Sequence, residues 1–209
     1  MAQFLQEYSY GNMHPFLFSI FSKYAKVDDK ILDVWSGSWA WGKRLLDSGY
    51  IDINLIDGFL EPDIHFENFI KSDFTKELPY DDAEFDFVTN LEVIEHVENP
   101  FLLMREMLRT IKPGWYLMIS TPNINTIIGK LLFLISGNLI GFLKSDGIFQ
   151  TFPAHISPFY LPSILAYFDG KIDLMDTYYS IWKFPFTWWE MPVKNKYFGN
   201  TVVYIFKKI

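Results

Sequence analysis

The chain has 209 residues, which suits a single α/β domain over residues 1–209 with one substantial core. Its 18 Lys and Arg residues against 25 Asp and Glu residues give a formal net charge of −7, and no basic run is dense enough to neutralise a row of phosphates. We therefore expect no nucleic-acid partner, and the absence of cysteine excludes disulfides and thiolate metal sites. The first twelve residues lack a basic start followed by an apolar run, so we expect a cytoplasmic protein.

Strand-like and helix-like runs alternate through the first half of the chain. Apolar side chains at helical spacing predict an amphipathic helix over residues 14–26. Gly49 closes a second predicted helix over residues 40–48, because glycine is favoured just past a helix end. Asn99 and Pro100 begin a third helix as its cap and first residue. Short apolar runs predict five strands, at residues 31–34, 51–56, 69–72, 85–89 and 116–120.

Residues 124–143 are strongly apolar and about as long as a membrane span of roughly 20 residues. Because polar residues and glycines interrupt this run, we favour a buried or substrate-covering helix pair and expect residues 124–160 to form a substrate-covering insertion within the domain. A helix over residues 160–168 and two strands, at 172–181 and 201–206, close the chain. We expect an aromatic cluster between these strands to pack the hairpin, with stacking of a sugar or apolar substrate as the alternative; it comprises Phe184, Phe186, Trp188 and Trp189.

This succession predicts an α/β fold, namely a three-layer, Rossmann-like, doubly wound and mostly parallel sheet of about seven strands with an antiparallel C-terminal edge strand. Ligands of such sheets bind beyond the carboxyl ends of the strands, where the strand order reverses. Asp33, Asp57, Asp73 and Asn90 fall at four of those ends. Asp57 lies in the interval after Asp33 at which a carboxylate accepts hydrogen bonds from ribose hydroxyls, so we expect a nucleotide-cofactor site there.

Five stretches of the chain carry a recognisable pattern: ILDVWSGSW, NLID, FIKSDF, FDFVTNLEVIEHVENP and IKPGWYLMISTPN. They resemble the class I S-adenosylmethionine-dependent methyltransferase domain, in the branch that reads LDVGCGxG, Asp at strand two, FDxVxxxEVIEH and LKPGGxLxIxTPN. The resemblance covers residues 31–123, and its EVIEH and TPN blocks are specific. It implies S-adenosylmethionine as the cofactor.

The resemblance also implies a role for each matching residue. Carboxylates accept hydrogen bonds from hydroxyls and amines, which agrees with these roles. In this assignment Asp33 and Gly37 border the methionine moiety of the cofactor, Asp57 its ribose, Asp73 and Phe74 its adenine, and Asn90 and Leu91 its other flank.

The chain departs from the family pattern at Trp35, Trp39 and Trp115, each of which stands where the pattern has glycine. A non-glycine residue in a left-handed conformation costs about 1–2 kcal/mol, and an indole brings on the order of 200 Å² of surface to a loop that should approach a ligand. Three interpretations remain open: the loop has refolded with its indoles in solvent or beside the cofactor, the site is lost, or the sequence is an altered version of a competent one. Core filling by the indoles is the plainer alternative, although a tight strand-to-helix loop is a poor place for it.

A second group of residues combines acids with histidines. If residues 91–97 form a helical turn, Glu92, Glu95 and His96 share one face and can hold a divalent ion, with His155 as a candidate fourth ligand. Small-RNA methylating enzymes and quinone-biosynthetic O-methyltransferases are similar in using this ExxEH block for metal. We favour a structural or substrate-lining role for the block over metal binding. His96 and His155 are also candidate catalytic bases, because an imidazole can deprotonate an acceptor hydroxyl.

Two functions from different classes follow. The leading hypothesis is an S-adenosylmethionine-dependent methyltransferase that acts on an oxygen or nitrogen of a small-molecule, glycan or lipid-linked acceptor. The alternative is a methyltransferase-like binding or scaffold protein that has lost cofactor binding through Trp35 and Trp39. A peripheral membrane contact, or an oligomer contact, through residues 124–143 is compatible with either.

Overall fold

The structure, a computed structural model, describes residues 13–37, 39–58, 68–73, 76–139, 142, 155–180, 182–183, 190–191 and 195–209. Within these residues seven strands build the main sheet: β1 (Lys30–Val34), β2 (Asp52–Asp57), β3 (Phe69–Lys71), β4 (Phe85–Leu91), β5 (Ile111–Pro122), β6 (Ile172–Tyr179) and β9 (Thr201–Lys208). Their order is β3-β2-β1-β4-β5-β9-β6. Neighbours from β3 to β5 are parallel, whereas β9 is antiparallel to both β5 and β6. The predicted fold class is confirmed, with β9 as the antiparallel C-terminal strand and β6 beside it at the edge.

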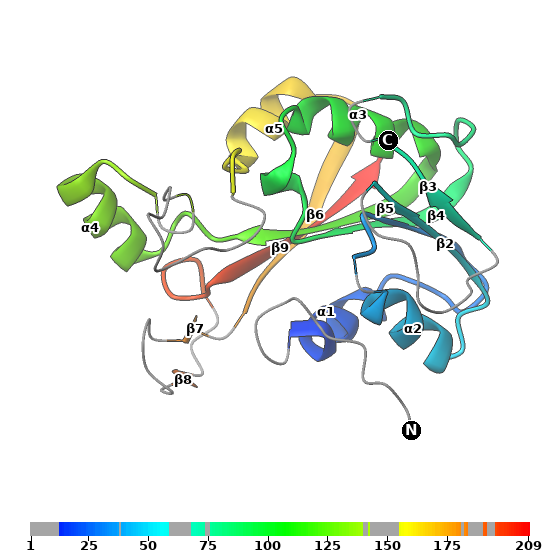
Figure 1. Cartoon of the computed structure of the whole chain (residues 1–209), viewed down its shortest axis with the longest axis horizontal. Helices are drawn as coiled ribbons and strands as arrows, with labels where there is room; N and C mark the ends of the chain where they lie inside the picture. The colour runs from blue at the N-terminus through cyan, green and yellow to red at the C-terminus, as the bar shows by residue number, and fades with distance from the viewer. Residues whose placement is uncertain are drawn as a thin grey trace.

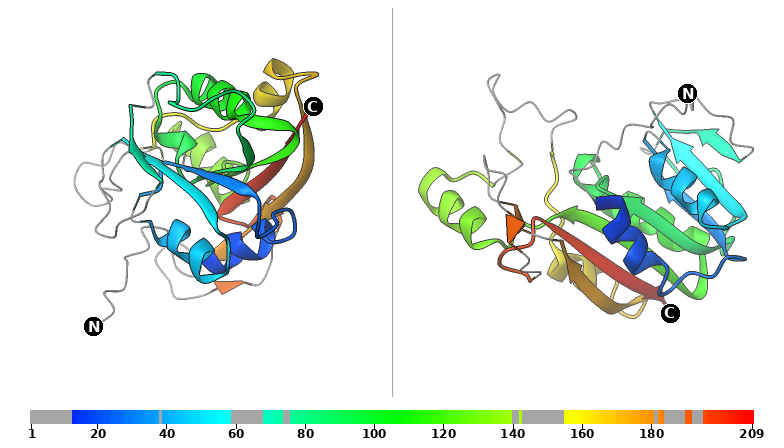
Figure 2. Two further views of the ribbon diagram at one scale, coloured as in Figure 1. Left: turned by 90° about the vertical axis from the view of Figure 1, so that its right-hand side faces the viewer. Right: turned by 90° about the horizontal axis from the view of Figure 1, so that it is seen from below.

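Helices cover both faces of this sheet (Figures 1 and 2). One face carries α1 (Met13–Phe21) and α2 (Ala40–Asp47), and the other carries α3 (Pro100–Thr110) and α5 (Leu161–Tyr167). A further helix, α4 (Ile127–Ser136), stands off the sheet at one end of the long axis of the molecule (Figure 1). Two short strands, β7 (Trp182–Lys183) and β8 (Glu190–Met191), form a separate ladder. The three-layer architecture is therefore present.

Successive residues of the central strands supply the two cores in turn. In β1, Ile31 packs in the core beneath α1 and α2, whereas Leu32 packs in the core beneath α3 and α5. In β4, Phe87 and Val88 divide in the same way. Side chains of a strand alternate between the two faces, so a strand covered by helices on both sides can be apolar at successive positions. The apolar runs of the sequence are thus explained by burial on both faces.

Local sequence signals place most element boundaries. The Asn99 side chain accepts a hydrogen bond from the backbone N–H of Leu102 at 3.0 Å, and Pro100 is the first residue of α3, as predicted. Gly49 follows α2 with φ +91°. The first helix is shorter than predicted and ends at Phe21, and β5 begins at Ile111, where it already pairs with Phe85. Pairing with a neighbouring strand is a tertiary contact that local signals do not contain.

The long apolar stretch forms α4 over part of its length. Residues 140–141 and 143, within the predicted helix pair, lie outside the described part of the chain, as do residues 143–154 of the predicted insertion and the aromatic cluster Phe184, Phe186, Trp188 and Trp189. Among the residues that the structure describes, none of the helices has the length and apolar character needed to cross a membrane. The sequence favoured a buried or substrate-covering helix pair here. The structure shows one helix of it, and burial is the wrong expectation for α4, because six of its large apolar side chains are exposed and Gly129 is its buried residue.

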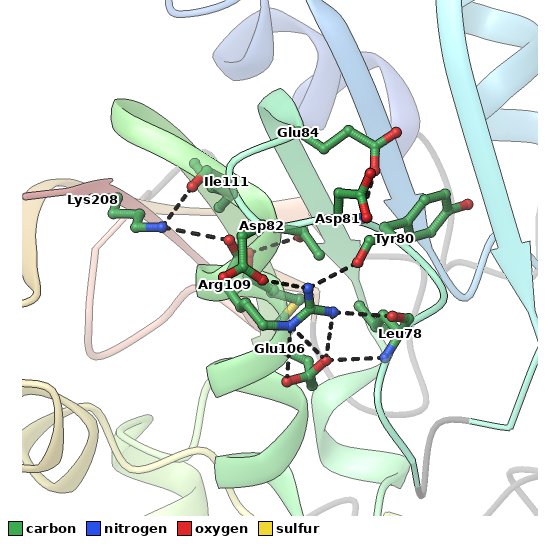
Figure 3. Close-up of polar contacts among 11 residues, drawn as sticks. Leu78, Tyr80, Asp81, Asp82, Glu84, Glu106, Arg109, Ile111 and Lys208 are labelled. Atoms are coloured by element: carbon green, nitrogen blue, oxygen red, sulfur yellow. Dashed lines mark hydrogen bonds and ion pairs between the residues drawn. The ribbon is translucent and has the colours of Figure 1, made fainter.

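A polar cluster around Arg109, at the end of α3, fixes the loop that leads into β4 (Figure 3). The guanidinium donates to the carbonyl oxygens of Tyr80 at 2.8 Å and Leu78 at 3.0 Å. It also pairs with the carboxylates of Glu106 and Asp82, each at 2.8 Å. A planar guanidinium can make several such bonds at once, so one side chain secures the segment that precedes β4.

Candidate active site

The ends of β1, β2 and β4 bring three polar side chains to one edge of the sheet. β1 lies between the other two strands, so Asp33, Asp57 and Asn90 come from adjacent parallel strands. Asp33 is 3% exposed, and Asp57 and Asn90 are fully buried. This is the point at which the strand order reverses, where parallel sheets bind their ligands.

Asp33 is almost completely enclosed by the protein. The Thr89 hydroxyl donates a hydrogen bond of 2.7 Å to its Oδ1. Burial raises the pKa of Asp33 to about 7, while the Thr89 hydrogen bond opposes the shift and the nearby Asp57 carboxylate adds to it. Thr89 was missed by the sequence analysis, although a hydroxyl at the end of β4, level with Asp33 in the neighbouring strand, is a recognisable signal.

Asn90 carries a buried oxygen that makes no hydrogen bond within the described structure. Its Nδ2 donates to the carbonyl oxygen of Val34 at 3.3 Å, whereas Oδ1 has no partner among the residues described. The same holds for the Oγ of Ser36, which lies in the loop after β1. Burial of a polar atom without a hydrogen bond is costly. Such atoms fit a polar ligand at this edge.

The other residues assigned to the cofactor are less enclosed. Leu91 is half-buried at the end of β4, and Asp73 is exposed after β3, with a carboxylate oxygen 3.8 Å from the Lys76 Nζ. Phe74 lies outside the described residues. Of the predicted cofactor residues, Asp33, Asp57 and Asn90 therefore lie together on adjacent strand ends. On the predicted adenine side, Asp73 is exposed.

The loop between β1 and α2 keeps the backbone form of a glycine-rich loop. Trp35, Gly37 and Trp39 have φ values of 66°, 55° and 58°, all in the left-handed region. The amide N–H groups of Trp35 and Ser36 donate to the Ile56 carbonyl at 2.7 Å and 3.1 Å. The Gly37 N–H donates to Asp57 Oδ2 at 2.9 Å. The loop therefore accepts about 1–2 kcal/mol of strain at each tryptophan while its hydrogen bonds hold it to the end of β2.

The two indoles leave this loop in different directions. Trp39 is 4% exposed and packs in the core beneath α1 and α2, with its ring 6.4 Å from that of Phe69. Trp35 is half-buried, packs against the core beneath α3 and α5, and lies 6.4 Å from the ring of His96. The sequence analysis gave core filling as the plainer alternative, although it judged a tight loop a poor place for it. Trp39 does fill the core. Trp35 borders the site itself.

The acids and histidines of the EVIEH block lie next to Trp35. The predicted helical turn is realised as a single 3₁₀ turn, Ile94–His96, and Glu92 precedes it with φ +57°. One ligand atom each from Glu95, His96 and His155 lie within 4.8 Å of one another. Glu92 is outside this group, because a left-handed residue breaks the helical spacing on which the prediction of one shared face depended.

Glu92 and Glu95 are instead held by consecutive hydroxyls of β5. Ser120 Oγ donates to Glu92 Oε1 at 2.9 Å, and Thr121 Oγ1 donates to Glu95 Oε2 at 3.1 Å. Burial raises the pKa of Glu92 to about 7, against the effect of the Ser120 bond. Burial also raises the pKa of Glu95, and the neighbouring charge of Glu92 adds to this shift. These two hydroxyls were missed by the sequence analysis, although they stand directly before the proline of the TPN block.

His155 reaches the site through the backbone of Glu95. The Glu95 carbonyl accepts hydrogen bonds from Ile156 N at 2.8 Å and Ser157 N at 3.0 Å. This contact places His155 Nε2 4.0 Å from Glu95 Oε1, an oxygen that has no hydrogen bond within the described residues. His155 is distant from Glu95 in the sequence, and these main-chain hydrogen bonds bring it to the Glu95 carboxylate.

Four rings form a row across this part of the site. The His96 and His155 rings lie 4.7 Å apart, with Trp35 6.4 Å beyond His96 and Phe142 5.2 Å beyond His155. All four side chains are half-buried. The row runs from Trp35, in the loop after β1, to Phe142, which follows α4 in the chain. The two imidazoles therefore lie between two apolar rings.

The fold and the site together define a class I methyltransferase. The chain belongs to the methyltransferase-domain family, whose model matches residues 7–193. Its structure is similar to that of an S-adenosylmethionine-dependent methyltransferase from Methanosarcina mazei, with a TM-score of 0.62 and 20% identity over 91% of this chain and 97% of that one. It is also similar to an S-adenosylmethionine-dependent methyltransferase from Archaeoglobus fulgidus, with a TM-score of 0.57 and 18% identity over 94% of this chain and 93% of that one. At these identities the likeness is one of fold.

Curated relatives match shorter stretches. A ubiquinone biosynthesis O-methyltransferase from Maricaulis maris is 46% identical over 43 residues, which are 21% of this chain and 17% of that protein. The mitochondrial ubiquinone biosynthesis O-methyltransferase of Dictyostelium discoideum is 36% identical over 94 residues, 43% of this chain and 26% of that protein. The matches thus span about a sixth to a quarter of the relatives' length.

The opposite environments of the two indoles predict different responses to glycine. Trp39→Gly should lower the free energy of unfolding by on the order of 3 kcal/mol, because loss of a buried indole outweighs relief of strain. Trp35→Gly should change it by less than about 1 kcal/mol, because a half-buried ring and the strain offset each other. Urea unfolding of both variants measures the difference. A larger loss for Trp35→Gly than for Trp39→Gly would contradict these placements.

The raised pKa of Asp33 predicts a stability change that depends on pH. The pKa is about 7 in the folded state and near its ordinary value when unfolded, so the protonated group stabilises the fold at low pH and this contribution is lost as the pH rises toward 7. Asp33→Asn resembles the protonated form at every pH. It should raise the free energy of unfolding at pH 8 by on the order of 2 kcal/mol and have much less effect near pH 4.

Urea unfolding at both pH values checks this expectation. Asp47→Asn is the matched control, because Asp47 is exposed and paired with Lys43 at 2.7 Å. An Asp33→Asn effect of equal size at both pH values would show that the carboxyl is not held protonated by burial.

Proposed function

We propose that the protein transfers a methyl group from S-adenosylmethionine to a hydroxyl oxygen of a small-molecule acceptor. The observation that carries this proposal is the pair of imidazoles, His96 and His155, beside the buried Glu95 at the carboxyl edge of the sheet. A hydroxyl must lose its proton as it is methylated, and an imidazole is suited to take it near neutral pH. The broader expectation, an oxygen or nitrogen of a small-molecule, glycan or lipid-linked acceptor, contains this narrower one.

The names of the curated relatives support oxygen as the methylated atom. Both ubiquinone biosynthesis relatives are O-methyltransferases. The row of rings around His96 and His155 supports an acceptor with an apolar or planar part, because Trp35 and Phe142 flank the imidazoles. The exposed apolar side chains of α4, which leads toward Phe142, support an acceptor that carries a lipid tail.

The residues at the strand ends fit a cationic nucleotide cofactor. The carboxyl groups of Asp33 and Asp57 suit a positively charged, hydroxyl-bearing ligand, and the buried Oδ1 of Asn90 offers an acceptor without another hydrogen bond in the described structure. We assign Asp33 and Gly37 to the methionine moiety and Asp57 to the ribose. The remaining assignments are Asp73 and Phe74 to the adenine and Asn90 and Leu91 to the opposite flank.

In the proposed mechanism the cofactor supplies an electrophilic methyl group on its sulfonium. The chain itself orients the acceptor and manages one proton. The proton of the acceptor hydroxyl passes to the imidazole of His96 or His155, and Glu95 Oε1, 4.0 Å from His155 Nε2, stabilises the imidazolium that results. Alignment of the two reactants supplies most of the rate in such a transfer, so the rigid strand ends matter more than any single base.

A divalent metal at the same residues is a second proposal. One carboxylate and two imidazoles, from Glu95, His96 and His155, are donors that zinc and related metals accept, and their atoms lie within 4.8 Å of one another. A metal there would lower the pKa of a bound acceptor hydroxyl. These three residues would hold it, and Glu92 would remain on Ser120.

Cofactor binding is tested by thermal unfolding with S-adenosylhomocysteine, the demethylated product. A ligand at a hundredfold over its dissociation constant adds about 2.7 kcal/mol to the free energy of unfolding. We expect a shift in Tm that is abolished in Asp57→Ala and kept in the exposed control Asp47→Ala.

The same assay tests the alternative of a binding or scaffold protein without cofactor. No shift in the wild type at millimolar ligand would contradict the enzyme proposal. A shift that appears only in Trp35→Gly would identify the Trp35 indole as the obstruction and support the alternative.

Metal binding is tested by titrating chelator-treated protein with zinc and, separately, magnesium in a calorimeter. If the site is a metal centre, Glu95→Gln should weaken zinc binding at least tenfold, because it removes the anionic ligand. Glu92→Gln is the matched control and should keep the affinity. Absence of binding by the wild type, or equal loss in both variants, would leave the histidines as bases only.

A further inference from the structure

Helix α4 exposes an unusual amount of apolar surface. Six of its ten residues are large apolar side chains with 42% to 82% of their surface exposed, and the two most exposed are Leu134 at 81% and Ile135 at 82%. The complete set is Ile127, Leu131, Leu132, Phe133, Leu134 and Ile135. Contiguous exposed apolar surface of this kind marks an interaction site.

The distribution of these side chains around α4 indicates what kind of partner fits. A helix turns about 100° per residue, so five of the six exposed residues, from Leu134 through Ile127 to Leu132, span an arc of about 160°. Phe133 lies outside this arc, about 100° from either end. A helix that packs against one neighbour buries a stripe of roughly 100°. The arc is wider than one helix–helix contact covers, which favours a deformable apolar medium over a second copy of the chain.

The charges around α4 favour an anionic surface. Residues 123–139 and 195–200 carry two lysines, Lys130 and Lys196, and no Asp or Glu, although the whole chain has a net charge of −7. The two segments are joined, because Ile127 N donates to the Tyr197 carbonyl at 3.0 Å. Lys130, Lys196 and Tyr197 are exposed. Lysines attract anionic lipid headgroups, and tyrosine is favoured at the membrane–water interface.

The position of α4 connects such a surface with the site. Figure 1 and the right-hand view of Figure 2 show α4 standing off the α/β body beyond the end of β5. Phe142, which follows α4, lies 5.2 Å from the ring of His155. At about 1.5 Å per residue α4 is roughly 15 Å long, half of a hydrocarbon core, so it can lie in a bilayer surface but not cross it.

We propose that α4 docks on an anionic lipid bilayer, with its apolar arc in the headgroup–acyl boundary and Lys130 and Lys196 at the headgroup phosphates. Interfacial helices bind in this way through buried apolar area together with attraction to anionic lipid. The docking is independent of methyl transfer, and it places the row of rings next to the lipid surface.

The test is flotation of the full chain with vesicles of phosphatidylcholine alone or with a third of phosphatidylglycerol. The wild type should float with the anionic vesicles, and high salt should weaken this binding. The double variant Leu134→Glu/Ile135→Glu should bind at least tenfold more weakly. Ile51→Glu is the matched control and should bind as the wild type, because Ile51 is 78% exposed and precedes β2, away from α4. Each of Lys130→Glu and Lys196→Glu should weaken binding about fivefold or more.

Size-exclusion chromatography and the shift in Tm with S-adenosylhomocysteine complete the test. An unchanged ligand shift in the double variant shows that the fold is intact, so a loss of vesicle binding then belongs to α4. Failure of the wild type to float overturns the proposal. Vesicle binding that survives in the double variant also overturns it. A wild-type dimer that the double variant converts to monomer, without vesicle binding, overturns it in favour of a second copy as the occupant.

Discussion

The reversal of strand order at β1 is the constraint on which the site depends. Because β1 pairs in parallel with β2 on one side and β4 on the other, the carboxyl ends of these strands meet at one edge. Strand pairing brings Asp33, Asp57 and Asn90 to this edge, and all three are buried there. Burial then sets the chemistry, because it raises the pKa of Asp33 and leaves an Asn90 oxygen without a hydrogen bond within the described chain. The buried polar groups are costly to the fold, and they form a place that suits a charged ligand.

The tryptophan-substituted loop shows how hydrogen bonds can preserve a backbone that its sequence disfavours. Trp35 and Trp39 both keep left-handed conformations. The carboxyl end of β2 holds residues 35–37 through the Ile56 carbonyl and the Asp57 carboxylate, and Trp39 N donates to the Ser36 carbonyl at 2.9 Å. Burial of the Trp39 indole offsets strain that glycine would avoid. Trp35 is only half-buried, and its ring lies 6.4 Å from that of His96. The same substitution therefore fills the core at one position and lies beside His96 at the other.

The EVIEH block is organised by contacts with distant segments. Ser120 and Thr121 on β5 hold the carboxyl groups of Glu92 and Glu95, and the Glu95 carbonyl holds the segment that carries His155. Each of these bonds joins residues that are far apart in the chain. The bonds to Glu95 bring its carboxylate, His96 and His155 into one cluster, whereas the Ser120 bond holds Glu92, which is not part of that cluster. The same cluster serves as a proton acceptor or a metal site in the two proposals, because both need a buried carboxylate beside imidazoles.

The sequence by itself determined the fold class, the α3 cap at Asn99 and Pro100, and the strand ends that carry Asp33, Asp57 and Asn90, because strand burial and helix capping leave local periodicity and residue preferences. It left open which face each indole of the loop takes, and it grouped Glu92 with Glu95 and His96 by a helical spacing that a left-handed Glu92 does not follow. The early start of β5, the burial of Trp39 and the arrival of His155 at Glu95 were decided by tertiary structure alone. Strand pairing, core volume and main-chain bonds between distant segments are properties of the assembled molecule, and no window of neighbouring residues contains them.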